Sequence, residues 1–125
     1  MVGNLRSLAV DGDSAMMVNG TGTYMVDLAH QTHGVRLVWS GAGSAVTKHP
    51  DHSTFFLGNK YGFFSYREGK TKPIRWKNQI IYPTSFDWHK DTLWLGTLTS
   101  GLLAYHEPHR FTSSMSKKAM CFYCA

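Results

Sequence analysis

The chain has 125 residues and a formal net charge of +5, a size typical of one domain. Hydrophobic residues make up 42% and charged residues 17%, which excludes a disordered tail and a coiled coil. The positive charge favours anionic partners but falls short of a dedicated nucleic-acid binder. No apolar stretch approaches the roughly 18 residues of a membrane helix, so we expect no membrane partner.

Short apolar runs separated by turn residues predict β-strands along the whole chain. No window of 12 residues has a helical period, so the expected fold class is all-β. The expected strands, in chain order, are Leu5–Val10, Met16–Asn19, Thr23–Leu28, Val35–Ser40, Ala45–Lys48, Thr54–Gly58, Gly62–Tyr66, Ile74–Lys77, Thr84–Trp88, Thr92–Thr97, Gly101–Tyr105 and Arg110–Ser113.

These strands recur with a period of about 39 residues. Asp27, Tyr66 and Tyr105 align, and so do Val18, Leu57 and Leu95. Four strands per unit of about 40 residues is typical of a β-propeller blade, whereas a β-sandwich has no reason to repeat in this way. We therefore expect a single propeller segment over residues 1–125, with blades at about 5–40, 44–77 and 84–113 and a tail at 114–125.

The segment Asp91–Tyr105, which contains Leu-Trp-Leu-Gly-Thr and then Gly-Leu-Leu-Ala-Tyr, resembles the two-component-regulator propeller repeat. Ser53–Tyr66 matches the repeat in part, with Phe56 where Trp94 stands, and Ser14–Asp27 is a degenerate copy. In that family such blades build sensor domains, often glycan-sensing, ahead of a membrane helix and a kinase. The resemblance implies the fold and says little about the ligand.

Three blades do not close a ring, because propellers have about four to eight blades. The apolar sides of the first and last blades must then be covered by self-association, by another subunit of a larger assembly, or by the rest of a longer protein. Cys121 and Cys124 lie too close to the C-terminus to staple the fold, which favours a reducing, cytoplasmic location. A fragment of a longer sensor protein would instead be extracellular or periplasmic.

Histidine is frequent, and six of the seven histidines form the pairs His30/His33, His49/His52 and His106/His109. All three pairs fall in loops that emerge on one face of a propeller. Imidazole binds zinc or copper where three or four donors converge, and Cys121 and Cys124 are further zinc donors. Neighbouring blades fan apart, however, so we interpret the histidines as solvated loop residues and expect neither a metal nor a cofactor.

Two other groups of residues are candidate binding sites. Trp39, Trp76 and Trp88 end strands and are candidate platforms for stacking on a sugar, while Trp94 is expected in the core between blades. A basic cluster beside Tyr66 and Trp76 forms a candidate anion or nucleic-acid patch, with a solvated hairpin as the alternative; it consists of Arg67, Lys70, Lys72, Arg75 and Lys77.

Catalytic motifs are absent from the sequence. There is no Ser-His-Asp order, phosphate loop or His-Glu-x-x-His motif, and an acid–base pair of Asp87 and His89 is less favoured than a turn histidine. The sequence therefore predicts a non-enzymatic binding or scaffold module that presents loops to a ligand, such as a glycan, or to a protein partner. The alternatives are a lyase or glycosidase with its site at the ring centre, and a basic subunit of a nucleoprotein assembly.

Overall fold

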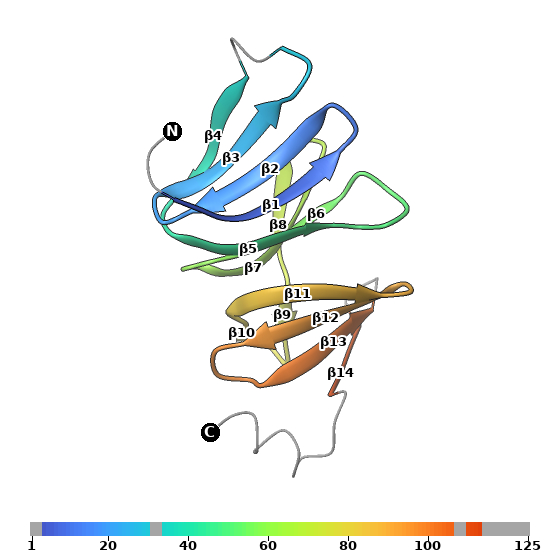
Figure 1. The fold of residues 1–125 in the computed structure, drawn as a ribbon. Coiled ribbons are helices and arrows are strands. Elements are labelled where there is room, and N and C mark those ends of the chain that lie inside the picture. The colour runs from blue at the N-terminus through green and yellow to red at the C-terminus, as the bar shows by residue number, and fades with distance from the viewer. Residues whose placement is uncertain (1–3, 31–33, 107–109, 114–125) are drawn as a thin grey trace.

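In a computed structural model, residues 4–30, 34–106 and 110–113 are described, and they form a partial β-propeller of three four-stranded antiparallel sheets (Figure 1). The predicted all-β propeller fold is confirmed. Sheet one contains β1 (Leu5–Asp11), β2 (Ser14–Asn19), β3 (Gly22–Asp27) and β4 (Val35–Ser40). Sheet two contains β5 (Gly43–Lys48), β6 (Phe55–Asn59), β7 (Gly62–Arg67) and β8 (Lys70–Pro73). Sheet three contains β11 (Pro83–His89), β12 (Thr92–Thr97), β13 (Leu102–His106) and β14 (Arg110–Ser113).

The fourth strand of sheet two differs from the prediction. Glu68 and Gly69 have left-handed φ values of 53° and 79°, so the chain reverses at once and Arg67 pairs with Lys70. The strand expected at Ile74–Lys77 is therefore wrong. Its residues form instead a separate two-stranded hairpin of β9 (Arg75–Trp76) and β10 (Gln79–Ile80), closed by a second left-handed turn. Within the described residues, no helix is long and apolar enough to span a bilayer.

The three sheets fan out from their first strands, and sheet two lies in the middle (Figure 1). One apolar core, which includes Met16, Val18 and Leu57, joins sheets one and two. A second core, which includes Phe56, Phe63 and Leu95, joins sheets two and three. We call the side of a sheet that faces onward along the chain its leading face, and the opposite side its trailing face.

The pairing register shows which residues of the three sheets correspond. Each first strand has one irregularity near its start. The first pair after this irregularity is Ser7 with Val18 in sheet one, Ala45 with Gly58 in sheet two, and Ser85 with Gly96 in sheet three. Val18 is therefore the counterpart of Gly58 and Gly96. The predicted ladder of Val18, Leu57 and Leu95 is wrong by one residue in the first repeat. By the same register, Met17 corresponds to Leu57 and Leu95, and Val26, not Asp27, corresponds to Tyr66 and Tyr105.

The first strands of the three sheets, β1, β5 and β11, lie nearest the axis of the stack, and we call them the innermost strands. Side chains on these strands hold neighbouring sheets together. The Ser7 hydroxyl donates to the Val46 carbonyl at 3.2 Å and accepts from the Val46 N–H at 3.1 Å. Ser44 donates to the Pro83 carbonyl at 2.6 Å, and the Arg6 guanidinium donates to the Gly43 carbonyl at 3.0 Å. Each contact bridges the open edge of one innermost strand to the next sheet, so these strands cannot separate without losing hydrogen bonds.

Among the described residues, the outer sides of the stack are open. On the trailing face of sheet one, four aliphatic side chains are about half exposed, namely Leu8, Val10, Val35 and Leu37. The counterpart of Leu8 inside the stack, Val46, is only 5% exposed. At the other end, Trp94 lies on the leading face of sheet three and is only half-buried, although a core position was expected for it.

We predict that Gly58→Ala destabilises the protein. A Cβ at Gly58 would lie 2.7 Å from the Pro83 carbonyl oxygen, so β6 of sheet two and β11 of sheet three would have to move apart. Overpacking of this kind costs about 1–3 kcal/mol in the free energy of unfolding. Urea denaturation at one fixed protein concentration measures it.

Gly20→Ala is the matched control, because its Cβ would meet only the movable end of the Arg6 side chain, at 3.3 Å. We expect a change within about 0.5 kcal/mol for this variant. Equal losses for the two variants would contradict a close approach of β6 and β11.

Candidate functional site

The described histidines lie at the rim where the first and third strands of the sheets end, which we call the histidine rim. His30 follows β3, His49 and His52 lie between β5 and β6, and His106 ends β13. The rings of His49 and His52 stack with centroids 3.5 Å apart, and His49 is buried edge-on against Trp88. Nδ1 of His49 accepts the Asp51 N–H at 3.0 Å, so this nitrogen serves the loop. His33, His109, Cys121 and Cys124 lie outside the described residues.

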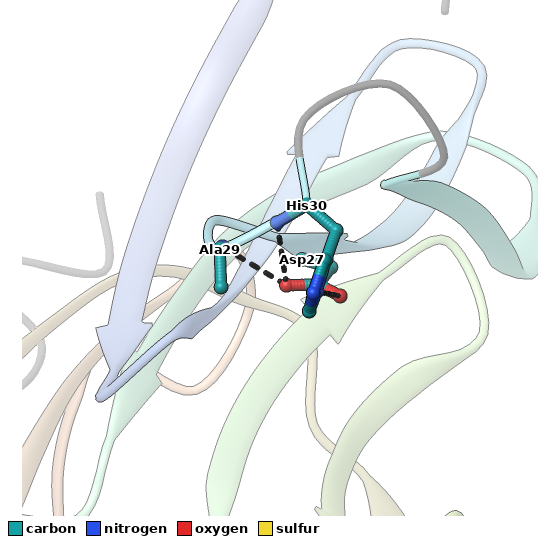
Figure 2. Close-up of polar contacts among 3 residues, drawn as sticks. All are labelled: Asp27, Ala29 and His30. Carbon is teal, nitrogen blue, oxygen red and sulfur yellow. Dashed lines mark hydrogen bonds and ion pairs between the residues drawn. The ribbon is translucent and has the colours of Figure 1, made fainter.

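Asp27 and His30 form a compact polar turn at the histidine rim (Figure 2). One carboxylate oxygen of Asp27 accepts the Ala29 and His30 N–H groups at 2.9 and 3.2 Å, and the other lies 3.0 Å from Nδ1 of His30. The hydrogen bond from the His30 ring, together with these two N–H groups, lowers the pKa of Asp27 below its usual 3.8. The bonds all close the turn itself, so we interpret it as structural.

The other predicted catalytic and metal candidates do not assemble in the described part of the chain. No hydrogen bond or ion pair joins Asp87 to His89 there, although both lie on β11. Across residues 4–30, 34–106 and 110–113, no three His, Cys, Asp or Glu side chains lie close enough to share a metal ion.

The three candidate tryptophans occupy separate places. Trp39 packs between sheets one and two, and Trp76 packs beside the second core under the Lys77 ammonium, 4.9 Å from its ring centroid. Trp88 packs against Phe56, and its indole N–H donates to the Thr47 hydroxyl at 2.9 Å. All three rings are half-buried in contacts between elements, so they do not form one shared platform.

The basic cluster lies at the outer edge of sheet two. The register places Arg67, Lys70 and Lys72 on the same face of β7 and β8, all exposed, and no ion pair involves them among the described residues. Lysines on an outer strand also protect its unpaired edge from other strands. Arg75 and Lys77 lie apart from these three, on the β9–β10 hairpin.

A cavity of about 170 Å³ opens where the three innermost strands begin. Its lining includes Arg6, Ser44 and Thr84 from the three sheets, together with Lys60 and Tyr82, and it contains no carboxylate. Arg6 and Lys60 therefore give it a positive potential. We call this end of the stack, opposite the histidine rim, the Lys60 rim.

An aromatic platform adjoins this cavity. Tyr61 follows Lys60 in the β6–β7 turn, is 46% exposed, and stacks on Trp39 with centroids 5.7 Å apart and an interplanar angle of 10°. The Lys60 ammonium lies 5.1 Å from the Tyr61 ring centroid. Tyr61 also borders a second cavity, of about 150 Å³, with Phe64 and Arg75. Arg6, Lys60 and Tyr61 were missed by the sequence reasoning, which drew only Trp39 from this group.

The turn that carries Lys60 and Tyr61 is rigid at its base. The buried Asn59 side chain accepts the Tyr61 N–H at 2.8 Å, as Asn19 accepts the Thr21 N–H at 2.8 Å in sheet one. Thr97 does the same for Ser100 at 2.9 Å in sheet three. A polar residue that ends the second strand of each repeat is the signal that could have located these turns.

We predict that the Asp27 carboxyl titrates with a midpoint below 3.8 in the folded protein. Because its pKa is depressed, its contribution to stability is present above pH 3.8 and is lost as the pH falls through the folded-state value. NMR titration of the Asp27 side-chain carbon measures it. His30→Ala should raise the midpoint, and His52→Ala should leave it unchanged. A midpoint at or above 3.8 would contradict the turn in Figure 2.

Comparison with known proteins bears on the fold. No protein-family model matches this chain, and no curated protein does. Solved structures do match it, and two of them are of the extracellular domain of one B. thetaiotaomicron protein, described as a hybrid two-component system in one and as a one-component system in the other. In each case the TM-score is 0.71, the sequence identity is 17%, and the match covers 90% of this chain but 17% of the other. The chain therefore shares its fold with a segment of a much larger extracellular domain.

Proposed function

We propose that this chain is part of a non-enzymatic, propeller-type recognition module that binds an acidic glycan at the Lys60 rim. The observation that carries the proposal is the positive cavity at the start of the innermost strands, with the exposed Tyr61 ring beside it. Small-molecule sites combine aromatic walls with a few convergent polar groups. A carboxylate or sulfate group suits the cavity, and the apolar face of its sugar ring suits Tyr61.

The size of the cavity limits what it holds. About 170 Å³ is smaller than the roughly 300–1,000 Å³ of most ligand pockets, so it suits one charged substituent. The rest of the glycan would then lie across the rim, toward Tyr61. Because the matching structures are extracellular domains, we propose an extracytoplasmic location instead of the cytoplasmic one expected from the cysteines.

We propose that the chain is one part of a ring. It spans 17% of the chains it matches, and its outer sheets present open apolar faces, which favours completion by further blades. These blades belong either to a homo-oligomer or to a larger assembly. A ligand or a protein partner would meet the loops at the rim of the completed ring, and no catalytic role is proposed.

A second candidate follows from the outer edge of sheet two. Arg67, Lys70 and Lys72 share one exposed face and form no ion pair among the described residues, which suits a phosphate backbone. This supports the nucleoprotein alternative. The two candidates use different lysines, so one set of variants distinguishes them.

We predict that Lys60→Gln and Tyr61→Ser each weaken binding of uronic-acid-containing or sulfated glycans about tenfold, which corresponds to about 1.4 kcal/mol. Lys60→Gln removes the charge, and Tyr61→Ser removes the stacking surface. Glycan-array screening followed by calorimetry measures the affinities, and circular dichroism checks that the variants fold. Lys72→Gln, on the far edge of sheet two, is the matched control and should bind like the wild type.

Equal binding of neutral and acidic glycans would contradict the proposal, as would wild-type affinity in Lys60→Gln. Nucleic-acid binding that weakens steeply with salt and is lost in Lys70→Gln/Lys72→Gln would support the second candidate in its place.

A further inference from the structure

The stack of described sheets has one open face at each end. Inside the chain, a leading face meets a trailing face twice, between sheets one and two and between sheets two and three. This leaves one leading face, on sheet three, and one trailing face, on sheet one. On both faces, the pairing register identifies the residues that correspond to those in contact at the two internal interfaces.

We propose that the leading face of sheet three docks on the trailing face of sheet one of a second copy of this chain, so that two copies close a ring of six sheets. The inference rests on the propeller part of the proposed function and is independent of any glycan. It fixes which residues meet, because the two internal interfaces supply the register.

The trailing face of sheet one has the apolar character that this docking requires. Met17 is half-buried, whereas its counterparts Leu57 and Leu95 are completely buried under the preceding sheet. Leu8 is 49% exposed, and its counterpart Val46 is 5% exposed. The difference in exposure therefore comes from the missing neighbour and not from a change to polar residues.

The leading face of sheet three supplies the matching side chain. Met16 and Phe56 hold the same position in sheets one and two, and both are completely buried in the next sheet. Trp94 holds that position in sheet three and is half-buried. An indole ring carries a large apolar area, and it would be covered by the aliphatic trailing face of sheet one.

The hydroxyl contacts of the innermost strands can also be repeated. Ser85 corresponds to Ser7, whose hydroxyl bonds both backbone groups of Val46; sheet two has Ala45 at this position and makes no such contact. In the second copy, the counterpart of Val46 is Leu8. Ser85 would therefore bond the Leu8 N–H and carbonyl groups, and Thr84 would donate to the Leu5 carbonyl as Ser44 does to that of Pro83.

A second copy fits the geometry of ring closure. Two chains of three sheets give six, within the about four to eight blades of known propellers. A leading face on a trailing face is a heterologous contact, which gives a closed ring when the rotation closes and an open fibre when it does not. Each copy carries a trailing face on sheet one and a leading face on sheet three, so the two copies can contact each other twice.

Asp87 is a residue of the proposed interface at which a substitution should strengthen the contact between the two copies. It corresponds to Thr47, which accepts the Trp88 indole N–H in the internal interface. Opposite Asp87, the second copy presents Val10, the counterpart of Trp88, so the carboxylate would face an aliphatic side chain. We expect Asp87→Thr to tighten the dimer about tenfold in sedimentation experiments.

Cysteine cross-linking tests the register. A Cβ at Gly58 would lie 3.2 Å from the Pro83 Cβ, close to the roughly 3.5–4.5 Å that separate these atoms in disulfides. The corresponding pair across the proposed interface is Gly96 of one copy and Leu5 of the other. We would place Gly96→Cys and Leu5→Cys in the full chain, with Cys121→Ser and Cys124→Ser to remove the native thiols, and add a mild oxidant.

We expect a covalent dimer, and no larger species, on a non-reducing gel. Leu5→Cys with Asp91→Cys, an exposed turn residue at the opposite end of β12, should give no dimer. In the unmodified chain, sedimentation should show twice the chain mass at micromolar concentration, and Leu8→Arg/Leu37→Arg should abolish the dimer while Leu28→Arg, in an exposed loop, does not.

The internal pair Gly58→Cys and Pro83→Cys separates two kinds of failure. If it closes within one chain and Gly96→Cys/Leu5→Cys stays monomeric, the blades pack as described but the two-copy ring is wrong. A ladder of multimers from Gly96→Cys/Leu5→Cys would also overturn the closed ring. If neither pair forms a disulfide, the packing of the sheets, and with it the proposed function, is wrong.

Discussion

The close approach of each innermost strand to the preceding sheet is the constraint on which the rest of the structure depends. Gly43 lies so near sheet one that a Cβ there would be 2.7 Å from the Val18 Cβ, and Gly58 lies as near to the Pro83 carbonyl. At these points there is no room for a side chain. The hydroxyls of Ser7 and Ser44 donate hydrogen bonds to backbone carbonyls of the neighbouring innermost strand. The sheets are held together at the axis and diverge outward. Larger side chains such as Phe56 and Tyr105 therefore fill the space between them, which widens away from the axis. The positive cavity exists because β1, β5 and β11 all begin at this pinned axis.

Much of the fold was predictable from the sequence, because short apolar runs recur with the period of the four-stranded sheets. The fourth strand at Val35–Ser40 was predicted with its observed bounds. The first ladder shows the limit of reading residue types alone. Val18 was matched to Leu57 and Leu95, yet it lies on the leading face while they lie on the trailing faces. Side chains alternate between the faces of a strand, so an error of one residue moves a side chain to the opposite core. Only the pairing with β1, β5 and β11 reveals it, since Val18 stands where the other sheets have glycine.

The candidate site was harder to predict, because its residues come together across the axis and not along the chain. Arg6 and Lys60 are 54 residues apart in sequence and line the same cavity. The predicted candidates were the tryptophans and the densest charges; in the structure Trp39, Trp76 and Trp88 pack between elements, and the charges lie at the edge of sheet two and on the β9–β10 hairpin. The Lys77 ammonium lies over the Trp76 ring, and the Trp88 indole N–H donates to the Thr47 hydroxyl. Tyr61 was overlooked because a tyrosine in a two-residue turn carries no motif. Its exposure follows from the left-handed φ of 137° at Gly62, which restarts the strand immediately and leaves the turn at the tip.

The separation of faces and rims allows a repeat protein to carry distinctive side chains in one turn without repeating them in the others. The faces must keep apolar residues of matched size, because each face packs against a neighbour of the same kind. The turns after Asn19, Asn59 and Thr97 share only a capping side chain at their base, and the residues beyond that cap lie in loops at the rim, where Tyr61 stacks on Trp39 of sheet one. Gly20 and Thr21 follow the first cap, Lys60 and Tyr61 the second, and Leu98 to Ser100 the third. Charge and aromatic surface therefore occur together in one turn of the three. That turn belongs to the middle sheet, whose two neighbours hold its innermost strand in place from both sides.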